Sequence, residues 1–148
     1  MPIPDLDENG LLPAGVHDCA LEEIKARFGV FRGSDRRPQL FAKLECFVSE
    51  ARKSTLVVCV IVDGSFVTAK SEPDDVDLII VVATNHDFLS DLTPSAYNIL
   101  SKQSVRRRYG FDLLVAHENS VEFGQWIEFF QQVRLEPERQ KGILRLLL

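Results

Sequence analysis

Residues 55–82 read TLVVCVIVDGSFVTAKSEPDDVDLIIVV. Two apolar runs, 55–62 and 76–82, enclose a polar segment that begins at Asp63-Gly64-Ser65. Apart from Asp77, neither run alternates between apolar and polar residues, which is typical of strands buried on both faces. We therefore predict two central strands, with one or two helical turns at 66–70 between them.

The rest of the sequence adds helices and strands around these two. Helical spacing of apolar residues predicts helices at 21–28, 40–51 and 121–133 and a weaker one at 95–108. An apolar run predicts a strand at 111–116, and the run at 142–148 fits a closing strand or a short helix, of which we favour the strand. We expect Asp18 to cap the first helix and Gly29 to end it, loops at 32–38 and 86–94, and an extended arm over residues 1–17. This order predicts an α/β or α+β fold with a central sheet flanked by helices. The 148 residues suit one domain, 1–148, with its core at 55–116.

Composition excludes some classes of protein. The formal charge of −5 argues against non-specific coating of nucleic acid, which needs a net basic surface. Three widely spaced cysteines argue against a disulfide framework and against a zinc motif, and favour free thiols in the cytoplasm. The first residues do not resemble a signal peptide, and the longest apolar stretch is too short to span a bilayer, so we expect no membrane association.

Carboxylates interrupt the predicted buried strands. Asp75 and Asp77 are two residues apart, so they share one face of a strand, and Asp112 opens a later strand in the same way. If those strands are neighbours, three carboxylates converge, and they repel one another unless a cation neutralises them. Carboxylate oxygens suit Mg²⁺ or Mn²⁺ as metal ligands. Carboxylates at strand ends can also simply face water, which is the structural alternative.

The segment between the strands has features of a phosphate site. Gly64 allows close approach to the backbone, and the Ser65 hydroxyl and the following helical turn offer hydrogen-bond donors. Lys70 adds a positive charge that either contacts phosphate or is only solvated. A phosphate site beside a metal site indicates phosphoryl or nucleotidyl transfer.

These residues resemble the signature of the polymerase-beta-type nucleotidyltransferase superfamily. The matching pattern is Gly64-Ser65, nine residues, Asp75-Val76-Asp77-Leu78, and later Phe111-Asp112-Leu113, within about 56–116. The chain is most similar to small prokaryotic, minimal nucleotidyltransferases, including a group with an arm like Leu12–His17 and an ending like Lys141-Gly142-Ile143. It departs from many small relatives at Thr68, where they carry Arg, and at Asp63, which adds a negative charge beside the phosphate site.

The resemblance implies a nucleotidyltransferase-like mixed sheet and roles for individual residues. Asp75 and Asp77 would bind Mg²⁺ or Mn²⁺, with Asp112 as a third ligand that helps to activate the acceptor hydroxyl. Gly64, Ser65 and Lys70 would hold a nucleoside triphosphate such as ATP.

The expected activity is transfer of a nucleoside monophosphate to a tRNA, another RNA or a protein hydroxyl, in a toxin–antitoxin or phage-defence system with a cognate toxin or antitoxin partner. The alternative is a catalytically weak binding module or antitoxin that acts through a protein partner.

Other functional signals are weaker. Arg106, Arg107 and Arg108 either complement a helix C-terminus or contact a nucleic-acid phosphate backbone. Phe123, Trp126 and Phe130 are at helical spacing, which favours core packing over base stacking.

Overall fold

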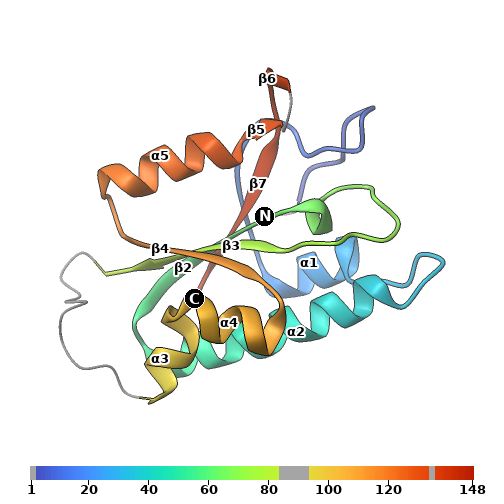
Figure 1. The fold of residues 1–148 in the computed structure, drawn as a ribbon. Helices are drawn as coiled ribbons and strands as arrows, with labels where there is room; N and C mark the ends of the chain where they lie inside the picture. The colour runs from blue at the N-terminus through green and yellow to red at the C-terminus, as the bar shows by residue number, and fades with distance from the viewer. Residues whose placement is uncertain (1–2, 84–93, 134–135) are drawn as a thin grey trace.

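A five-stranded mixed sheet forms the centre of the molecule (Figure 1). The computed structural model describes residues 3–83, 94–133 and 136–148. The strand order is β1-β7-β2-β3-β4, in which β1 and β7 are parallel, β3 and β4 are parallel, and β2 is antiparallel to both β7 and β3. The strands are β1 (Gly15–Cys19), β2 (Val57–Asp63), β3 (Asp77–Val82), β4 (Asp112–His117) and β7 (Gly142–Leu147). A separate two-stranded sheet pairs β5 (Gln132–Val133) with β6 (Glu136–Gln140).

Helices cover the two faces of the sheet unequally (Figure 1). One face carries α1 (Leu21–Phe28), α2 (Arg36–Ser54), α3 (Pro94–Leu100) and α4 (Lys102–Tyr109), whose apolar side chains form one buried cluster with the sheet. The other face carries α5 (Val121–Phe130), and Phe123, Trp126, Ile127 and Phe130 of this helix pack on a second, smaller cluster. Phe123, Trp126 and Phe130 thus pack against the core as expected but are only partly buried, and Phe130 also lines the pocket described below.

The side-chain alternation in the central strands explains the two clusters. In β2, Val60 and Val62 belong to the cluster under α1–α4, whereas Cys59 and Ile61 belong to the cluster under α5. β3 divides in the same way, because successive side chains of a strand point to opposite faces. Both strands are buried on both faces, as their unbroken apolar runs predict.

The predicted class, an α+β fold with a central mixed sheet flanked by helices, is confirmed. The predicted strands at 55–62, 76–82, 111–116 and 142–148 and the predicted helices at 21–28 and 40–51 all exist, with small shifts at their ends. Gly29 ends α1 as expected. No helix in the described ranges combines the length and the apolar character that a membrane crossing requires.

The N-terminal segment corrects the sequence interpretation. Residues 15–17, expected to belong to the extended arm, lie instead in edge strand β1, which pairs with β7. Asp18 lies within this strand and forms an ion pair with Arg145 at 2.5 Å, so it does not cap α1. The N-cap is Ala20, whose backbone N–H donates to the Glu23 carboxylate at 3.0 Å.

Other boundaries also differ from the predictions. The helix expected at 95–108 is two helices, because Ser101 starts a new one by accepting a hydrogen bond from the Ser104 backbone N–H. The turn expected at 66–70 is one short 3₁₀ turn, η1 (Ser65–Val67). The helix expected at 121–133 ends at Phe130 and leads into β5, and the loop expected at 32–38 is shortened because α2 begins at Arg36. The expected loop at 86–94 lies outside the described residues, except Pro94, which begins α3.

Candidate active site

A row of three aspartates crosses the sheet at one end of its central strands. Asp63 on β2 is the register partner of Asp77 on β3, and Asp77 is the register partner of Asp112 on β4. Register partners in adjacent strands point to the same face. Here that face is the one covered by α5, because Ile79, two residues after Asp77, lies in the α5 cluster. The prediction that the strand of Asp112 lies beside the strand of Asp77 is therefore confirmed.

The two outer members of this aspartate row each have a basic partner. Asp63 is only 4% exposed, and its carboxylate accepts a hydrogen bond from Lys141 Nζ at 2.7 Å. Burial raises the pKa of Asp63, and the adjacent ammonium of Lys141 works in the opposite direction. Asp112 is exposed and forms an ion pair with Arg106 of α4. The negative charge that the sequence places at position 63 is thus neutralised by a lysine 78 residues further along.

Asp77, at the centre of the row, has no such partner. None of the residues that the structure describes donates a hydrogen bond to its carboxylate. Burial, followed by the negative charges of Asp75, Asp63 and Asp112, raises the pKa of Asp77 to about 6. The site therefore has an unmet demand for positive charge at Asp77.

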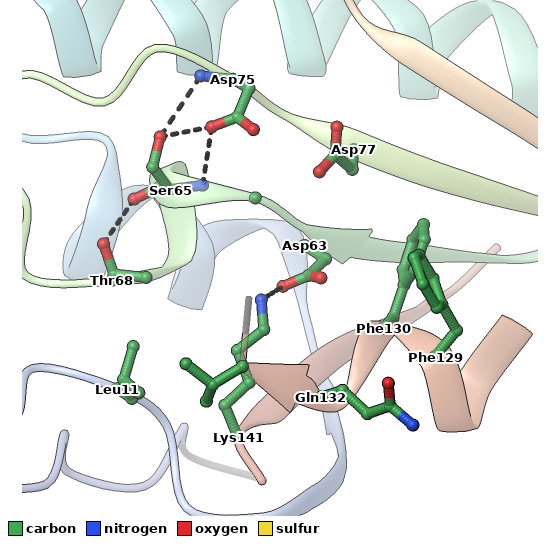
Figure 2. Close-up of a pocket in the computed structure, with 12 residues that line it drawn as sticks. Leu11, Asp63, Ser65, Thr68, Asp75, Asp77, Phe129, Phe130, Gln132 and Lys141 are labelled. Atoms are coloured by element: carbon green, nitrogen blue, oxygen red, sulfur yellow. Dashed lines mark hydrogen bonds and ion pairs between the residues drawn. The ribbon is translucent and has the colours of Figure 1, made fainter. Parts of the chain in front are cut away.

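Asp75 is bound to the turn that follows β2. Its Oδ1 accepts hydrogen bonds from the Ser65 backbone N–H at 3.0 Å and from the Ser65 hydroxyl at 2.5 Å (Figure 2). Burial by itself would raise the pKa of Asp75, but these hydrogen bonds hold it below the ordinary value. In this structure, both donors of Ser65 that the sequence assigns to phosphate thus serve to fix Asp75.

Gly64 is required by the backbone of the site. Its φ of 93° lies in the region that favours glycine, and a Cβ there would stand 2.7 Å from the carbonyl oxygen of Asp75. That carbonyl accepts a hydrogen bond from the Phe66 backbone N–H at 3.2 Å. The close approach that Gly64 permits is therefore between two segments of this chain, the β2 turn and the segment leading into β3.

Two consecutive arginines at the start of α2 hold the segment between β2 and β3. Arg37 is fully buried between the rings of Phe28 and Phe66. Its guanidinium donates to the backbone carbonyls of residues 28, 66, 68 and 70 at 2.6–3.1 Å. Arg36 donates to the carbonyls of Pro73 and Asp74 at 2.8 and 3.0 Å. Arg36 and Arg37 together fix both ends of the segment that connects Ser65 to Asp75.

Asp63, Asp75, Asp77 and the Ser65 turn line one pocket of about 750 Å³ (Figure 2). Asp112 is not among the residues that line it. One side is formed by Asp63, Gly64, Ser65, Thr68, Asp75 and Asp77, and the other by Leu11, Phe129, Phe130, Gln132, Val133 and Lys141. The volume is in the range typical of small-molecule sites, roughly 300–1,000 Å³. Lys70 does not line this pocket, and its ammonium pairs with Asp74 at 2.8 Å. The pocket cation is Lys141 instead.

The geometry for metal binding is incomplete. Within the described parts of the chain, no three Asp, Glu, His or Cys side chains lie close enough together to form a metal-binding group. The donor set is nevertheless of the right chemistry, since Asp77 is an unpartnered, partly buried carboxylate beside Asp75. Divalent cations with hard oxygen ligands meet such a demand.

Sequence reasoning assigned no role in the site to Asp63, Lys141, Phe129 or Arg37, although it placed the charge of Asp63 beside the phosphate position. The sequence does contain a signal for Asp63, because this aspartate ends a buried strand in the same way that Asp77 begins one. Lys141 and Phe129 have none, because their positions depend on the pairing of β5 with β6 and on where α5 ends. The basic cluster at 106–108 splits, since Arg106 pairs with Asp112 and Arg108 with Glu50.

Comparison with known proteins places the chain by family alone. No curated protein and no solved structure matches it significantly. One family matches nearly the whole chain, over residues 4–147. The chain therefore belongs to that family, which is described as a family of unknown function (DUF6932).

Proposed function

We propose that this protein is a metal-dependent nucleotidyltransferase that moves a nucleoside monophosphate group from a nucleoside triphosphate to a hydroxyl of an RNA, such as a tRNA, or of a protein. The observation that carries the proposal is the aspartate row with Asp77 unpartnered at its centre, beside Asp75 and the Ser65 turn. A cytoplasmic role in a toxin–antitoxin or phage-defence system, with a cognate protein partner, is part of this proposal.

Asp75 and Asp77 would hold Mg²⁺ or Mn²⁺, and Asp112 would complete the set. When bound, the metal would neutralise these carboxylates and stabilise negative charge on the phosphates. The proposal requires Asp112 to leave Arg106, an exposed ion pair of small energetic weight.

The residues of the chain would position the reactants. Asp112 would accept the proton of the acceptor hydroxyl as its oxygen bonds to the α-phosphorus and pyrophosphate leaves. Lys141, whose ammonium contacts Asp63 in the pocket, would also offer it to phosphate oxygens, the task that the resemblance implies for Lys70. The hydrogen bonds from Arg36 and Arg37 would keep Ser65 and Asp75 in place, because positioning and electrostatics dominate phosphoryl-transfer catalysis.

The test is incubation with each α-labelled nucleoside triphosphate, Mg²⁺ and total bacterial RNA. We expect label on RNA or protein with the unmodified chain and none with Asp77→Asn. Asp74→Asn is the matched control, because Asp74 is an exposed aspartate next to the site that lines no part of the pocket. Full activity of Asp77→Asn would rule out the proposed metal site.

A catalytically weak binding module is the second candidate. It is favoured by the absence of a converged metal-binding group in the described residues and by the engagement of both Ser65 donors with Asp75. This candidate predicts that no nucleotide is transferred, and that Mg²⁺ with a nucleotide leaves the melting temperature unchanged, since only a ligand of the folded state raises it.

A further inference from the structure

Besides Gln132 and Lys141, the side of the pocket opposite Asp75 and Asp77 carries four apolar side chains, two of them aromatic. Phe129 and Phe130 end helix α5 and form an aromatic wall of the pocket (Figure 2). The two rings are neighbours, with centroids 6.3 Å apart and planes at 48°. Both rings line the pocket, so an aromatic surface is available to a ligand there.

Phe129 is not used by the core of the protein. Its side chain is 66% exposed, whereas Phe130 packs partly against the apolar cluster under α5. These two consecutive aromatic residues therefore have different roles. Phe130 anchors the end of the helix, and the Phe129 side chain remains exposed at the pocket. Exposed apolar area at the edge of a pocket is a common mark of ligand contact.

We infer that this aromatic wall receives the planar heteroaromatic base of the nucleotide, with the base stacked on Phe129. The inference rests on the proposed function, because the phosphates must lie on the aspartate side. A nucleotide has a planar base at one end and metal-binding phosphates at the other. The pocket has a matching arrangement, with the aromatic wall on one side and the carboxylates on the other. Every base has a π-face, so such a wall binds bases without requiring one base sequence or type.

A polar side chain at the edge of the wall gives a means of selecting among bases. Gln132 follows the two rings and lines the same pocket. Its amide carries both a donor and an acceptor, which is what the edge of a nucleobase requires. Its backbone pairs with that of Gln140 across the β5–β6 sheet, which places the start of its side chain at the pocket.

The test compares ATP, GTP, CTP and UTP with inorganic tripolyphosphate, each with Mg²⁺, by isothermal titration calorimetry. Tripolyphosphate carries the charge without a base. We expect the best nucleotide to bind at least about ten-fold more tightly than tripolyphosphate, and Phe129→Ala to remove that advantage, in line with the usual strength of base stacking. Phe129→Trp should keep the advantage, and Phe129→Leu should lose most of it.

Phe31 provides the matched control. It is 64% exposed, close to the value for Phe129, but does not line the pocket, so Phe31→Ala should bind all five ligands as the unmodified chain does. Equal affinity for nucleotides and tripolyphosphate, or no effect of Phe129→Ala, would overturn the base site and leave the proposed function intact.

Failure of the proposed function has a different signature. If neither tripolyphosphate nor any nucleotide binds with Mg²⁺, while spermidine binds without it, the acidic and aromatic pocket is a site for organic cations, and both proposals are wrong.

Discussion

Replacing Asp77 by Asn should stabilise the protein at neutral pH. Burial and three neighbouring aspartates raise the pKa of Asp77 from 3.8 to about 6. At about 1.4 kcal/mol per pKa unit, the charged form costs about 3 kcal/mol in the folded state. Because Asp77 is partly exposed, solvent screening reduces the expected gain from Asp77→Asn to about 1–2 kcal/mol at pH 7.5.

The difference in stability between Asp77→Asn and the unmodified protein should depend on pH. The pKa of Asp77 is higher in the folded chain than in the unfolded chain, so the unfolded chain releases this proton at a lower pH. The free energy of unfolding of the unmodified protein therefore falls as pH rises from about 4 to 6. The extra unfolding free energy of Asp77→Asn should therefore reach its full value above about pH 6 and decrease towards pH 4.

The assay is urea denaturation of both proteins at several pH values between 4 and 8, with and without Mg²⁺. Asp112→Asn is the control, since Asp112 lies in the same row but is exposed and paired with Arg106, and we expect no stabilisation from it. Mg²⁺ should stabilise the unmodified chain and leave Asp77→Asn unchanged. An Asp77→Asn protein no more stable than the unmodified one at pH 7.5, or an advantage independent of pH, would refute the reasoning.

Three further substitutions test the framework of the site. Gly64→Ala places a Cβ 2.7 Å from a backbone carbonyl oxygen and should lower the unfolding free energy by roughly 3 kcal/mol. Gly33→Ala is the control, because Gly33 has a φ of 78° but no neighbour within 4 Å of the added Cβ, and it should cost about 1 kcal/mol. Equal costs would contradict the close-approach argument. Arg37→Met leaves up to four backbone carbonyls without a donor and should cost about 2–4 kcal/mol, with faster proteolysis at residues 66–70; unchanged proteolysis would count against it. Lys141→Met leaves the buried Asp63 carboxylate without its basic partner and should lower the unfolding free energy by about 3–5 kcal/mol at pH 7.5, measured by urea denaturation. Adding Asp63→Asn to this variant should restore most of that loss.

The sequence was informative about the central strands because their signal is local. Apolar runs that end in Asp63 and begin near Asp77 predict both the strands and the carboxylates at their ends, and the structure has them. β1 was missed because residues 15–19 are only half-buried and pair with residues 142–146, and a short edge strand of this kind carries little hydrophobic pattern.

The chemistry of the site was only half predictable for a related reason. The row of aspartates follows from residue positions once the register of β2, β3 and β4 is known, and parity within each strand gives the shared face. Which charges are neutralised depends on side chains that arrive from distant segments, such as Lys141 beside Asp63 and Arg106 beside Asp112. No spacing rule in the sequence anticipates those pairs.

The arginine at position 37 has a consequence for how the connection between β2 and β3 can evolve. Its guanidinium binds main-chain carbonyl oxygens at residues 66, 68 and 70 and, among their side chains, packs on the Phe66 ring. The hold of Arg37 on the connection is consequently independent of the exposed side chain at position 70, whereas Ala69 lies against Gly10. We expect relatives to keep an arginine near the start of α2 while the letter at position 70 drifts, so a search pattern anchored on that letter would lose members that share the same backbone path.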